Sequence, residues 1–438
     1  SSCDRIMAPQ SASFHAAGLW AETLFLKDTL ALAGIEADFE TIAEYKVAVD
    51  PLRRTEMTEH HREMLESLLD SIYAEVIGAV AEGRDMTVES VSALLDHVPL
   101  TAIQAKQAGL LDEVCYEDEL PVHLGTAQAP MALADWNQAQ KHLIDRRRWR
   151  SRRAIGIISL EGLIVTGSSR RPPLPLPLPL PLPLASPQAG SDTITQQLRA
   201  VGRNKRLAAL LLHVDSPGGS ALASDLIWRE IALLRQSKPV VVYMGSQAAS
   251  GGYYVSAPAN AIFAQPTTLT GSIGIFTGKI VTAGLYGKLH AGREVVSRGK
   301  AAGLYSDAAP FTADERNRIR DEIGASYARF KARVVEGRGL QEEDVEAIAR
   351  GRAWTGEQAL DRKLVDQLGD LRAAADHACA QAGLAPRRHA PLVAVSEPKG
   401  YQLPIPLPSE AGEWLAGLTA LFQEGILALA PWEVRFRD

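Results

Sequence analysis

The chain has 438 residues, a length that predicts two or three domains. Hydrophobic residues make up 46% of it and charged residues 22%, a composition that excludes a largely disordered protein. The net charge of −6 gives no basic bias of the kind that nucleic-acid binding requires. The three cysteines (Cys3, Cys115 and Cys379) are far apart and no HExxH motif occurs, so we expect neither a metal nor a cofactor.

The N-terminus reads Ser1-Ser2-Cys3, without an initiator methionine or a signal-peptide pattern. We therefore expect that the natural N-terminus is missing or that a leader has been removed. The rest of the sequence holds no uncharged apolar stretch long enough to cross a bilayer. A membrane anchor would accordingly have to lie upstream of Ser1.

An internal repeat relates an early part of the chain to a later part. The two parts match without a gap at an offset of 254 residues, as Thr58 and Thr312 illustrate. The matched segments are Thr58–Arg62 with Thr312–Arg316, Glu82–Arg84 with Glu336–Arg338, and Thr101–Asp112 with Thr355–Asp366. The alternative is a chance similarity of two amphipathic helices. We interpret the repeat as two copies of one domain, the first of which lacks its opening strands because its match begins well inside the second copy.

The repeat predicts four segments. Residues 1–130 form the C-terminal part of the first domain, residues 131–153 a basic linker, residues 154–385 a complete second domain and residues 386–438 a tail. The linker holds six arginines between Arg146 and Arg153, for which we favour a solvated connection over a polyanion-binding patch. The apolar tail segment Trp414–Ala430 is interrupted by Gln423 and Glu424, and we expect it to dock on a neighbouring subunit rather than to enter a membrane.

A proline-rich run at 172–187 interrupts the second domain. Because proline fixes φ and lacks an N–H, the run predicts polyproline II, and we favour an expanded loop over a ligand for an SH3-like partner. Around it, buried apolar runs alternate with amphipathic helices. The expected strands are Ala154–Leu160, Leu207–Val214, Val240–Met244 and Ile262–Ala264, and the expected helices are Thr193–Val201, Ser220–Gln236 and Ser250–Ala257. This alternation predicts an α/β fold with a parallel sheet.

Two loops that follow buried strands carry candidate catalytic groups. The first loop, Asp215–Ser220, contains Gly218 and Gly219 directly before a predicted helix. Glycine tolerates positive φ and lets the backbone approach a ligand closely. The loop can therefore present N–H groups to an oxyanion, although a tight strand-to-helix turn would look the same.

The second loop, Gln247–Tyr254, places Ser250 at a helix start, among small residues that leave room for a substrate carbonyl. Taken alone, this serine would be interpreted as a helix N-cap. Together with the first loop it predicts an acyl-transfer site, in which Ser250 is the nucleophile and the N–H of Gly251 completes the oxyanion hole. Ser216 is the competing nucleophile, but it precedes a proline within the turn, so we prefer Ser250.

The segments Asp215–Gly219, Ala248–Tyr254 and Thr270–Gly274 resemble the S49 serine peptidases, the family of signal peptide peptidase A or protease IV. The resemblance covers most of residues 1–385 and implies a ClpP/crotonase-like fold. The long form of the family has two such domains in tandem, in agreement with the repeat. This chain would then contain a complete second domain and an incomplete first one.

The resemblance also implies a Ser–Lys dyad, in which a lysine desolvated by burial accepts the proton of the serine. In the long form the base lies in the first domain, in a context matched here by Tyr45–Pro51, which assigns the role to Lys46. The alternative is Lys300, which follows Ser250 by 50 residues as in the short form and is the repeat equivalent of Lys46, but its surroundings lack the matching tyrosine and proline. We therefore prefer Lys46. At His213 the family commonly has arginine, and we expect a core or interface histidine there and not a base.

The function implied by the resemblance is that of a serine endopeptidase that cleaves hydrophobic peptides, such as spent signal peptides, through an acyl-enzyme. The resemblance further implies a membrane-associated homo-oligomer, with a tetramer expected, at the periplasmic face of a bacterial inner membrane. Two other classes stay open at this point. One is a non-catalytic oligomeric scaffold that binds proteins, and the other is an acyl-CoA enzyme of the crotonase class.

Overall fold

The computed structural model describes residues 3–16, 18–143, 153–170, 187–384, 391–395, 426–429 and 435–436. The chain divides into two compact units. The smaller unit comprises residues 1–22, 69–150 and 433–438, and the larger one comprises residues 23–68 and 151–432. Five of the six linker arginines, most of the proline-rich run and most of the apolar tail segment lie outside the described residues, so the predictions for these parts stay predictions.

The two units divide the chain differently from the predicted domains. Residues 23–68, which were assigned to the first domain with the rest of residues 1–130, pack with the second half of the chain. Lys46 therefore belongs to the same compact unit as Ser250.

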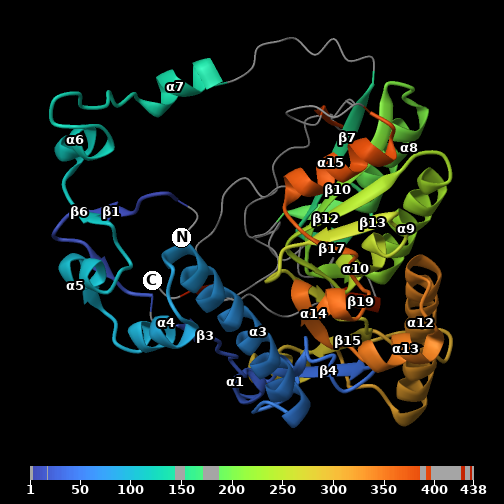
Figure 1. The fold of residues 1–438 in the computed structure, drawn as a ribbon. Coiled ribbons are helices and arrows are strands. Elements are labelled where there is room, and N and C mark those ends of the chain that lie inside the picture. Colours follow the sequence, from blue (N-terminus) through green and yellow to red (C-terminus); the bar gives the residue numbers. More distant parts are fainter. Residues whose placement is uncertain are drawn as a thin grey trace. The chain divides into compact units, whose positions relative to one another are not determined.

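Helices and short strand pairs build the smaller unit (Figure 1). Its helices are the part of α3 (Glu59–Arg84) from residue 69 on, α4 (Val88–Leu95), α5 (Ala102–Gln107), α6 (Leu120–Leu124) and α7 (Trp136–Leu143), with the 3₁₀ helix Glu117–Glu119 before α6. Its strand pairs are β1 (Met7–Ala8) with β6 (Glu113–Val114), β2 (Ser13–Phe14) with β5 (Leu100–Thr101), and β3 (Leu19–Trp20) with β20 (Arg435–Phe436). The buried residues Leu100, Ala102, Ala105 and Leu111 form a small core between these elements.

An eight-stranded sheet is the frame of the larger unit (Figure 1). Its strands run in the order β16-β14-β12-β10-β7-β18, and β13 pairs with both β12 and β17. The bounds are β7 (Ala154–Glu161), β10 (Leu207–Ser216), β12 (Val240–Ala249), β13 (Ala261–Ala264), β14 (Leu269–Gly271), β16 (Ala353–Thr355), β17 (Gln367–Leu368) and β18 (Leu392–Ala394). All these pairs are parallel except β14 with β16, which confirms the predicted α/β fold with a parallel-rich sheet.

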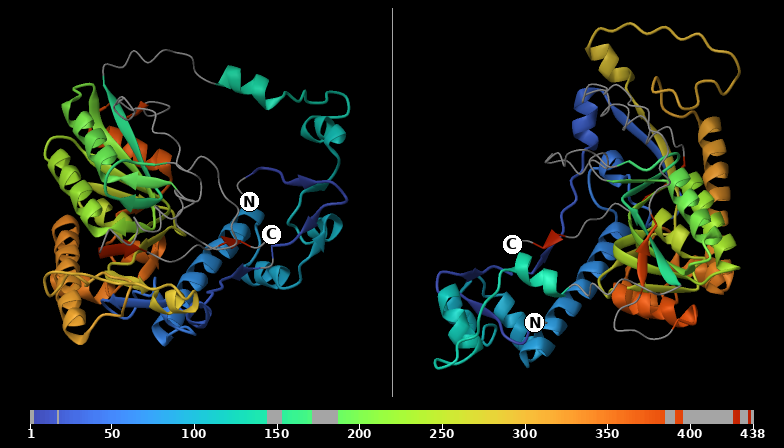
Figure 2. Two further views of the ribbon diagram at one scale, coloured as in Figure 1. Left: turned by 180° about the vertical axis from the view of Figure 1, so that it is seen from behind. Right: turned by 90° about the horizontal axis from the view of Figure 1, so that it is seen from above.

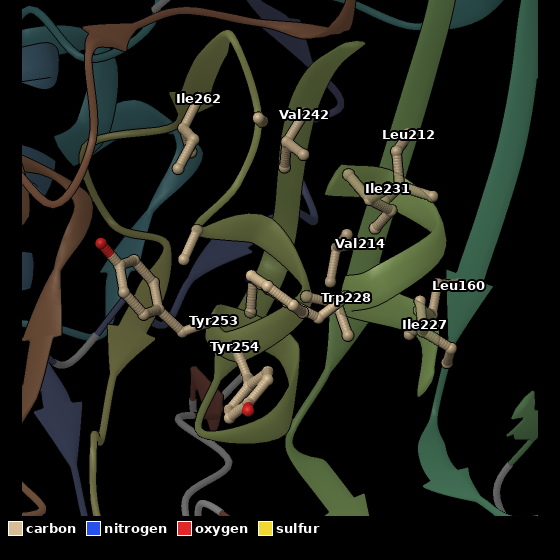
Figure 3. Close-up of a cluster of buried hydrophobic side chains, with 14 of the residues drawn as sticks. Leu160, Leu212, Val214, Ile227, Trp228, Ile231, Val242, Tyr253, Tyr254 and Ile262 are labelled. Atoms are coloured by element: carbon tan, nitrogen blue, oxygen red, sulfur yellow. The ribbon is translucent and has the colours of Figure 1, made fainter. Parts of the chain in front are cut away.

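Helices cover both faces of this sheet, because its central strands are apolar on both sides. On one face, Leu212 and Val214 of β10 pack in a core with α8 (Ser191–Arg203) and α9 (Ala221–Arg235), as Figure 3 illustrates around Ile231 of α9. On the other face, Leu211 packs with α15 (Leu371–Gln381). The alternation along β10 is the two-residue period of a strand. Every strand and helix predicted for the second half is present, although β12 extends five residues beyond the predicted end at Met244.

A second, six-stranded sheet joins the early segment to the second half of the chain (Figures 1 and 2). Its order is β4-β15-β19-β11-β8-β9, with bounds β4 (Glu36–Thr41), β15 (Phe276–Val281), β19 (Ile426–Leu429), β11 (Gly218–Ser220), β8 (Leu163–Val165) and β9 (Gln188–Gly190). β4 and β15 are antiparallel partners along six residues. Arg316 of α12 (Ala313–Arg338) strengthens this junction, because its guanidinium pairs with both Asp38 and Glu40 of β4.

The remaining helices of the larger unit are short. They are α1 (Lys27–Ala33), α2 (Asp50–Arg53), α10 (Gly251–Ser256), α11 (Ala283–Lys288), α13 (Glu342–Ile348) and α14 (Gly356–Asp361). Within the ranges that the structure describes, no helix combines the length and the hydropathy needed to span a membrane.

The segments matched in the sequence repeat adopt the same elements at the same offset. α3 corresponds residue for residue to α12, and α5 to α14. An arginine at the end of each long helix pairs with an aspartate, Arg84 with Asp112 and Arg338 with Asp366, and each aspartate also accepts a backbone N–H. The repeat thus extends to tertiary contacts, while its interpretation as two copies of one domain stays a prediction.

Candidate active site

Ser250 lies at the point where β12 ends and α10 begins. Two backbone hydrogen bonds hold it there: its N–H donates to the carbonyl of Gly271 at 2.8 Å, and its carbonyl accepts the N–H of Tyr254 at 2.8 Å. Its φ of 55° is left-handed, a strained conformation for a residue with a Cβ that is typical of functional sites. The side chain is fully buried and makes no capping bond to α10, so the interpretation as a simple N-cap does not describe it.

Lys46 reaches the same point from the loop between β4 and α2. Its side chain is buried, with 1% of the residue exposed, and its Nζ lies 2.7 Å from the Oγ of Ser250. The Nζ also lies 3.1 Å from the Oγ of Ser272 and 3.2 Å from the carbonyl oxygen of the same residue. The structure therefore brings together two residues that are 204 positions apart in the chain and that the sequence had paired as nucleophile and base.

The surroundings of the Lys46 amine favour its uncharged form. Burial holds the pKa of Lys46 well below its ordinary value of 10.5, because the buried ammonium would lose its hydration. The three oxygens within 3.2 Å of Nζ belong to Ser250 and Ser272 and carry no formal charge. A neutral amine has one lone pair and two N–H groups, so it can accept the Ser250 hydroxyl proton while donating to both Ser272 oxygens. The geometry thus fits a base.

Glycines line the space next to Ser250. A Cβ on Gly251 would lie 3.1 Å from the backbone nitrogen of Gly219, too close for any larger residue without a shift of the neighbours. Gly218 has a φ of 105°, a conformation that glycine alone adopts readily, and its N–H donates to the Oγ of Ser216 at 3.1 Å. The three glycines predicted for the oxyanion hole therefore meet, but the N–H of Gly218 is already bonded within its own turn.

The competing candidates lie elsewhere or have other partners. Lys300 is exposed in the connection between α11 and α12, and no contact joins it to Ser250. Ser216 is buried and accepts the N–H of Gly218. His213 is half-buried in β10 and stacks on the ring of Tyr243, with 5.7 Å between centroids, as expected for an ordinary packed histidine.

The sequence assigned no role to Ser272, although the segment Thr270–Gly274 contributed to the family resemblance. Ser272 also has a left-handed φ, 50°, and both of its oxygens contact the Lys46 amine. Gly274 makes room for the lysine, since an added Cβ there would lie 3.1 Å from Cδ of Lys46. The serine between two glycines was a signal in the sequence, but only the fold reveals what it touches. Among the described residues, no cluster of His, Cys, Asp and Glu side chains is arranged to hold a metal ion.

The model of peptidase family S49 matches residues 1–128 and 232–385, together more than half of the chain. The chain is 33% identical over 402 residues to the serine protease SPPA, chloroplastic, of Arabidopsis thaliana, a match that covers 90% of this chain and 58% of that protein. It is 29% identical over 390 residues to Protease 4 of Haemophilus influenzae, with 86% and 61% covered, and 29% identical over 355 residues to Protease 4 of Salmonella typhi, with 80% and 56% covered.

The chain accordingly belongs to peptidase family S49, which confirms the resemblance seen in the sequence. It spans 56 to 61% of the length of these three relatives.

Replacing Lys46 by methionine is expected to stabilise the protein at neutral pH. Since the folded-state pKa of Lys46 is lowered, the unfolded chain binds a proton that the folded chain releases, and the wild type loses stability as the pH falls from about 10.5 toward the folded-state pKa. Methionine has no ionisable group, so its burial adds no pH-dependent loss of stability. Thermal unfolding from pH 7 to 10 should therefore show Lys46→Met with the higher midpoint at pH 7 and a gap that narrows as the pH rises.

The matched control is Lys300→Met, which removes an exposed lysine and should leave the midpoint nearly unchanged at every pH. A gap that does not depend on pH would contradict a lowered pKa of Lys46, because differences in packing between lysine and methionine act equally at every pH.

Proposed function

We propose that this chain is the catalytic part of a serine endopeptidase in which Ser250 is the nucleophile and Lys46 the general base. The observation that carries the proposal is the 2.7 Å distance between Lys46 Nζ and Ser250 Oγ at a fully buried site. Membership of peptidase family S49 supports the reaction class. Among the described residues no acidic side chain contacts the Lys46 amine, so burial is what lowers its pKa, as a Ser–Lys pair requires.

The chemistry follows from these contacts. Ser250 Oγ attacks the peptide carbonyl carbon while its proton passes to the neutral Lys46 amine, and the carbonyl oxygen becomes an oxyanion. The Lys46 ammonium then returns the proton to the departing amine, which leaves an acyl-enzyme on Ser250. A water molecule next gives a proton to Lys46 and attacks the ester. Collapse of this second intermediate breaks the bond to Ser250 Oγ, which takes the proton back from Lys46, so that the acid is released and both Ser250 and the neutral amine are restored. Ser272 orients the amine throughout by accepting its N–H groups.

The proposed oxyanion hole consists of Gly251 with Gly218 or Gly219. A Cβ on Gly251 would lie 3.1 Å from both Gly218 Cα and Gly219 N, so the three backbones approach one another next to Ser250. The N–H of Gly218 donates to Ser216 Oγ, and Gly219 lies in β11, which pairs with β8 and β19. Backbone N–H groups aimed at the developing oxyanion stabilise acyl-transfer transition states by several kcal/mol, about 3–4 for one donor.

The second sheet supports an extended peptide as substrate. β19 pairs antiparallel with β11, the strand of Gly218 and Gly219, and on its other side with β15. The edges of β11 and β15 can thus accept a strand of peptide backbone next to the nucleophile. Main-chain pairing of this kind selects extended chains with little regard to sequence.

The finer features rest on the family resemblance. We propose hydrophobic peptides such as cleaved signal peptides as substrates, and a homo-oligomer, with a tetramer expected. We further propose attachment, through a segment outside this chain, to a bacterial inner membrane with the site facing the periplasm. Two tandem ClpP/crotonase-like domains are supported by the shared element order and the equivalent pairs Arg84–Asp112 and Arg338–Asp366.

The test is cleavage of a hydrophobic fluorogenic peptide by the wild type and three variants. Ser250→Ala and Lys46→Ala should each lower kcat by at least about a thousand-fold, because each removes half of a unit that acts together. Lys300→Ala, the repeat-equivalent lysine, should retain wild-type activity. The rate should rise with pH through the lowered pKa of Lys46, since only the neutral amine can accept a proton.

Loss of activity in Lys300→Ala with retention in Lys46→Ala would overturn the assignment of the base. A folded wild type that cleaves no peptide of this class would favour the non-catalytic scaffold instead.

Weakening β19 is expected to open the peptide slot. Leu427 of β19 pairs with Ser220 of β11 on one side and with Phe276 of β15 on the other. Leu427→Pro removes one backbone N–H from β19, which lies between these two strands. If β19 competes with substrate, KM for the fluorogenic peptide should fall several-fold while kcat stays constant. Leu427→Val keeps a strand-forming residue and is the matched control. A KM equal in all three proteins would show that β19 does not occupy the substrate position.

A further inference from the structure

A short loop of residues 350–352, between α13 and β16, is bonded to both sides of the site. Three backbone hydrogen bonds make this connection: Tyr45 N–H to the Arg350 carbonyl (3.2 Å), Gly351 N–H to the Ile273 carbonyl (2.8 Å), and Ser272 N–H to the Arg352 carbonyl (2.7 Å). The loop therefore ties the residue before Lys46 to the serine whose oxygens contact the Lys46 amine.

Gly351 forms one wall of the path that the lysine takes. Its φ is 81°, and a Cβ added to it would lie 2.5 Å from the backbone nitrogen and 2.7 Å from the Cβ of Lys46. Gly274 also lies close to this lysine, since a Cβ added there would lie 3.1 Å from Cδ of Lys46 and 2.8 Å from Cα of Gly351. Both glycines thus leave room for the stem of Lys46, and its direction depends on where the loop holds Gly351.

The side chain of Arg352 holds Tyr45, the residue before Lys46. Its Nη1 donates to Glu63 at 2.7 Å and to the hydroxyl of Tyr45 at 3.3 Å, and its guanidinium lies 4.9 Å from the centre of the Tyr45 ring. The Tyr45 hydroxyl in turn donates to Glu63 at 2.8 Å. The hydrogen bonds from Tyr45 and Arg352 lower the pKa of Glu63, which therefore stays a carboxylate at neutral pH.

In the part of the chain that the structure describes, the charged groups near Lys46 pair with one another and do not contact its amine. Glu63 pairs with Arg352, Glu44 pairs with Arg350 at 2.5 Å, and the buried Asp50 pairs with Arg53 at 2.7 Å. Arg352 consequently acts on the site through Tyr45 and through its own carbonyl, and not by touching the reacting atoms.

We propose that Arg352 is the positioning residue of this site, which holds Lys46 against Ser250 by binding Tyr45 and Glu63 with its side chain and Ser272 with its carbonyl. The inference rests on the proposed function for its catalytic consequence. Lys46 lies in a segment whose strand pairing ends at Thr41, five residues earlier. A local contact therefore has to fix the residues between Thr41 and Lys46. A displacement of about 1 Å in a reacting group can lower the rate about a hundred-fold.

The experiment compares Arg352→Met, Arg352→Lys and Arg320→Met with the wild type. Methionine keeps much of the apolar stem of Arg352 and removes the cation, whereas lysine restores a charge without the planar fork. Arg320→Met is the matched control, because it breaks another ion pair, with Glu40 at 2.8 Å, that joins the same early segment to the second half of the chain. For each protein, kcat and KM are measured from pH 6 to 10 with the fluorogenic peptide.

Arg352→Met should lower kcat about ten- to a hundred-fold at pH 7 with less than about a two-fold change in KM. It should also move the rising limb of the pH profile to higher pH, because a less firmly held amine gains water and its pKa returns toward the ordinary value. Arg352→Lys should recover part of the loss, and Arg320→Met should leave the profile in place. A loss of kcat that is equal at every pH, or a rising limb of the pH profile that stays in place, would overturn the proposal. Such a result is expected of a variant that is only structurally damaged.

A second measurement decides the proposal even if the wild type cleaves no peptide. The pH-dependent difference in unfolding midpoint between proteins with Lys46 and with Lys46→Met reports the lowered pKa of the lysine without any substrate. Introducing Arg352→Met into both proteins should shrink this difference, and introducing Arg320→Met should not. A difference that Arg352→Met leaves unchanged would reject the positioning role, whereas failed cleavage with a reduced difference would reject only the proposed reaction.

Discussion

The contact between the Lys46 amine and the Ser250 hydroxyl is the constraint around which the larger unit is arranged. An amine without a counter-charge is taken out of water there, which is unfavourable unless the amine gives up its proton. Ser250 and Ser272 on either side of it both have a left-handed φ, a further local strain. Strain and desolvation at one point persist only where the surrounding structure over-determines the geometry.

That surrounding structure has two parts, one of which positions Ser250 and the other Lys46. The eight-stranded sheet, apolar on both faces, positions Ser250 at the end of β12. The second sheet brings in Lys46, because β4 completes it by pairing with β15 and is further bound by Arg316. The Lys46 amine and the Ser250 hydroxyl thus come from different parts of this structure. The site is therefore a property of the junction between two distant stretches of sequence.

Much of this arrangement was readable from the sequence, and the reasons for the rest are physical. Apolar runs such as Leu207–Val214 identify a strand buried on both faces, and glycines and a serine after such strands mark a loop site. The Tyr45–Pro51 context indicated the lysine through the family resemblance. By contrast, the role of Ser272 depends on the oxygens that a folded loop presents. The packing of residues 23–68 with the second half of the chain depends on a non-local strand pairing between β4 and β15. The alternation in residues 36–41 is typical of a strand, but it does not indicate which strand is the partner.

The dependence of Lys46 on β15 has a consequence for synthesis of the chain. β4 leaves the ribosome long before its partner β15, because more than 230 residues separate Thr41 from Phe276. At about 5–20 residues per second, translation of that stretch takes on the order of tens of seconds. During this interval β4 cannot pair, because β15 has not yet been made. The contact between the Lys46 amine and the Ser250 hydroxyl can therefore form only after most of the chain has left the ribosome.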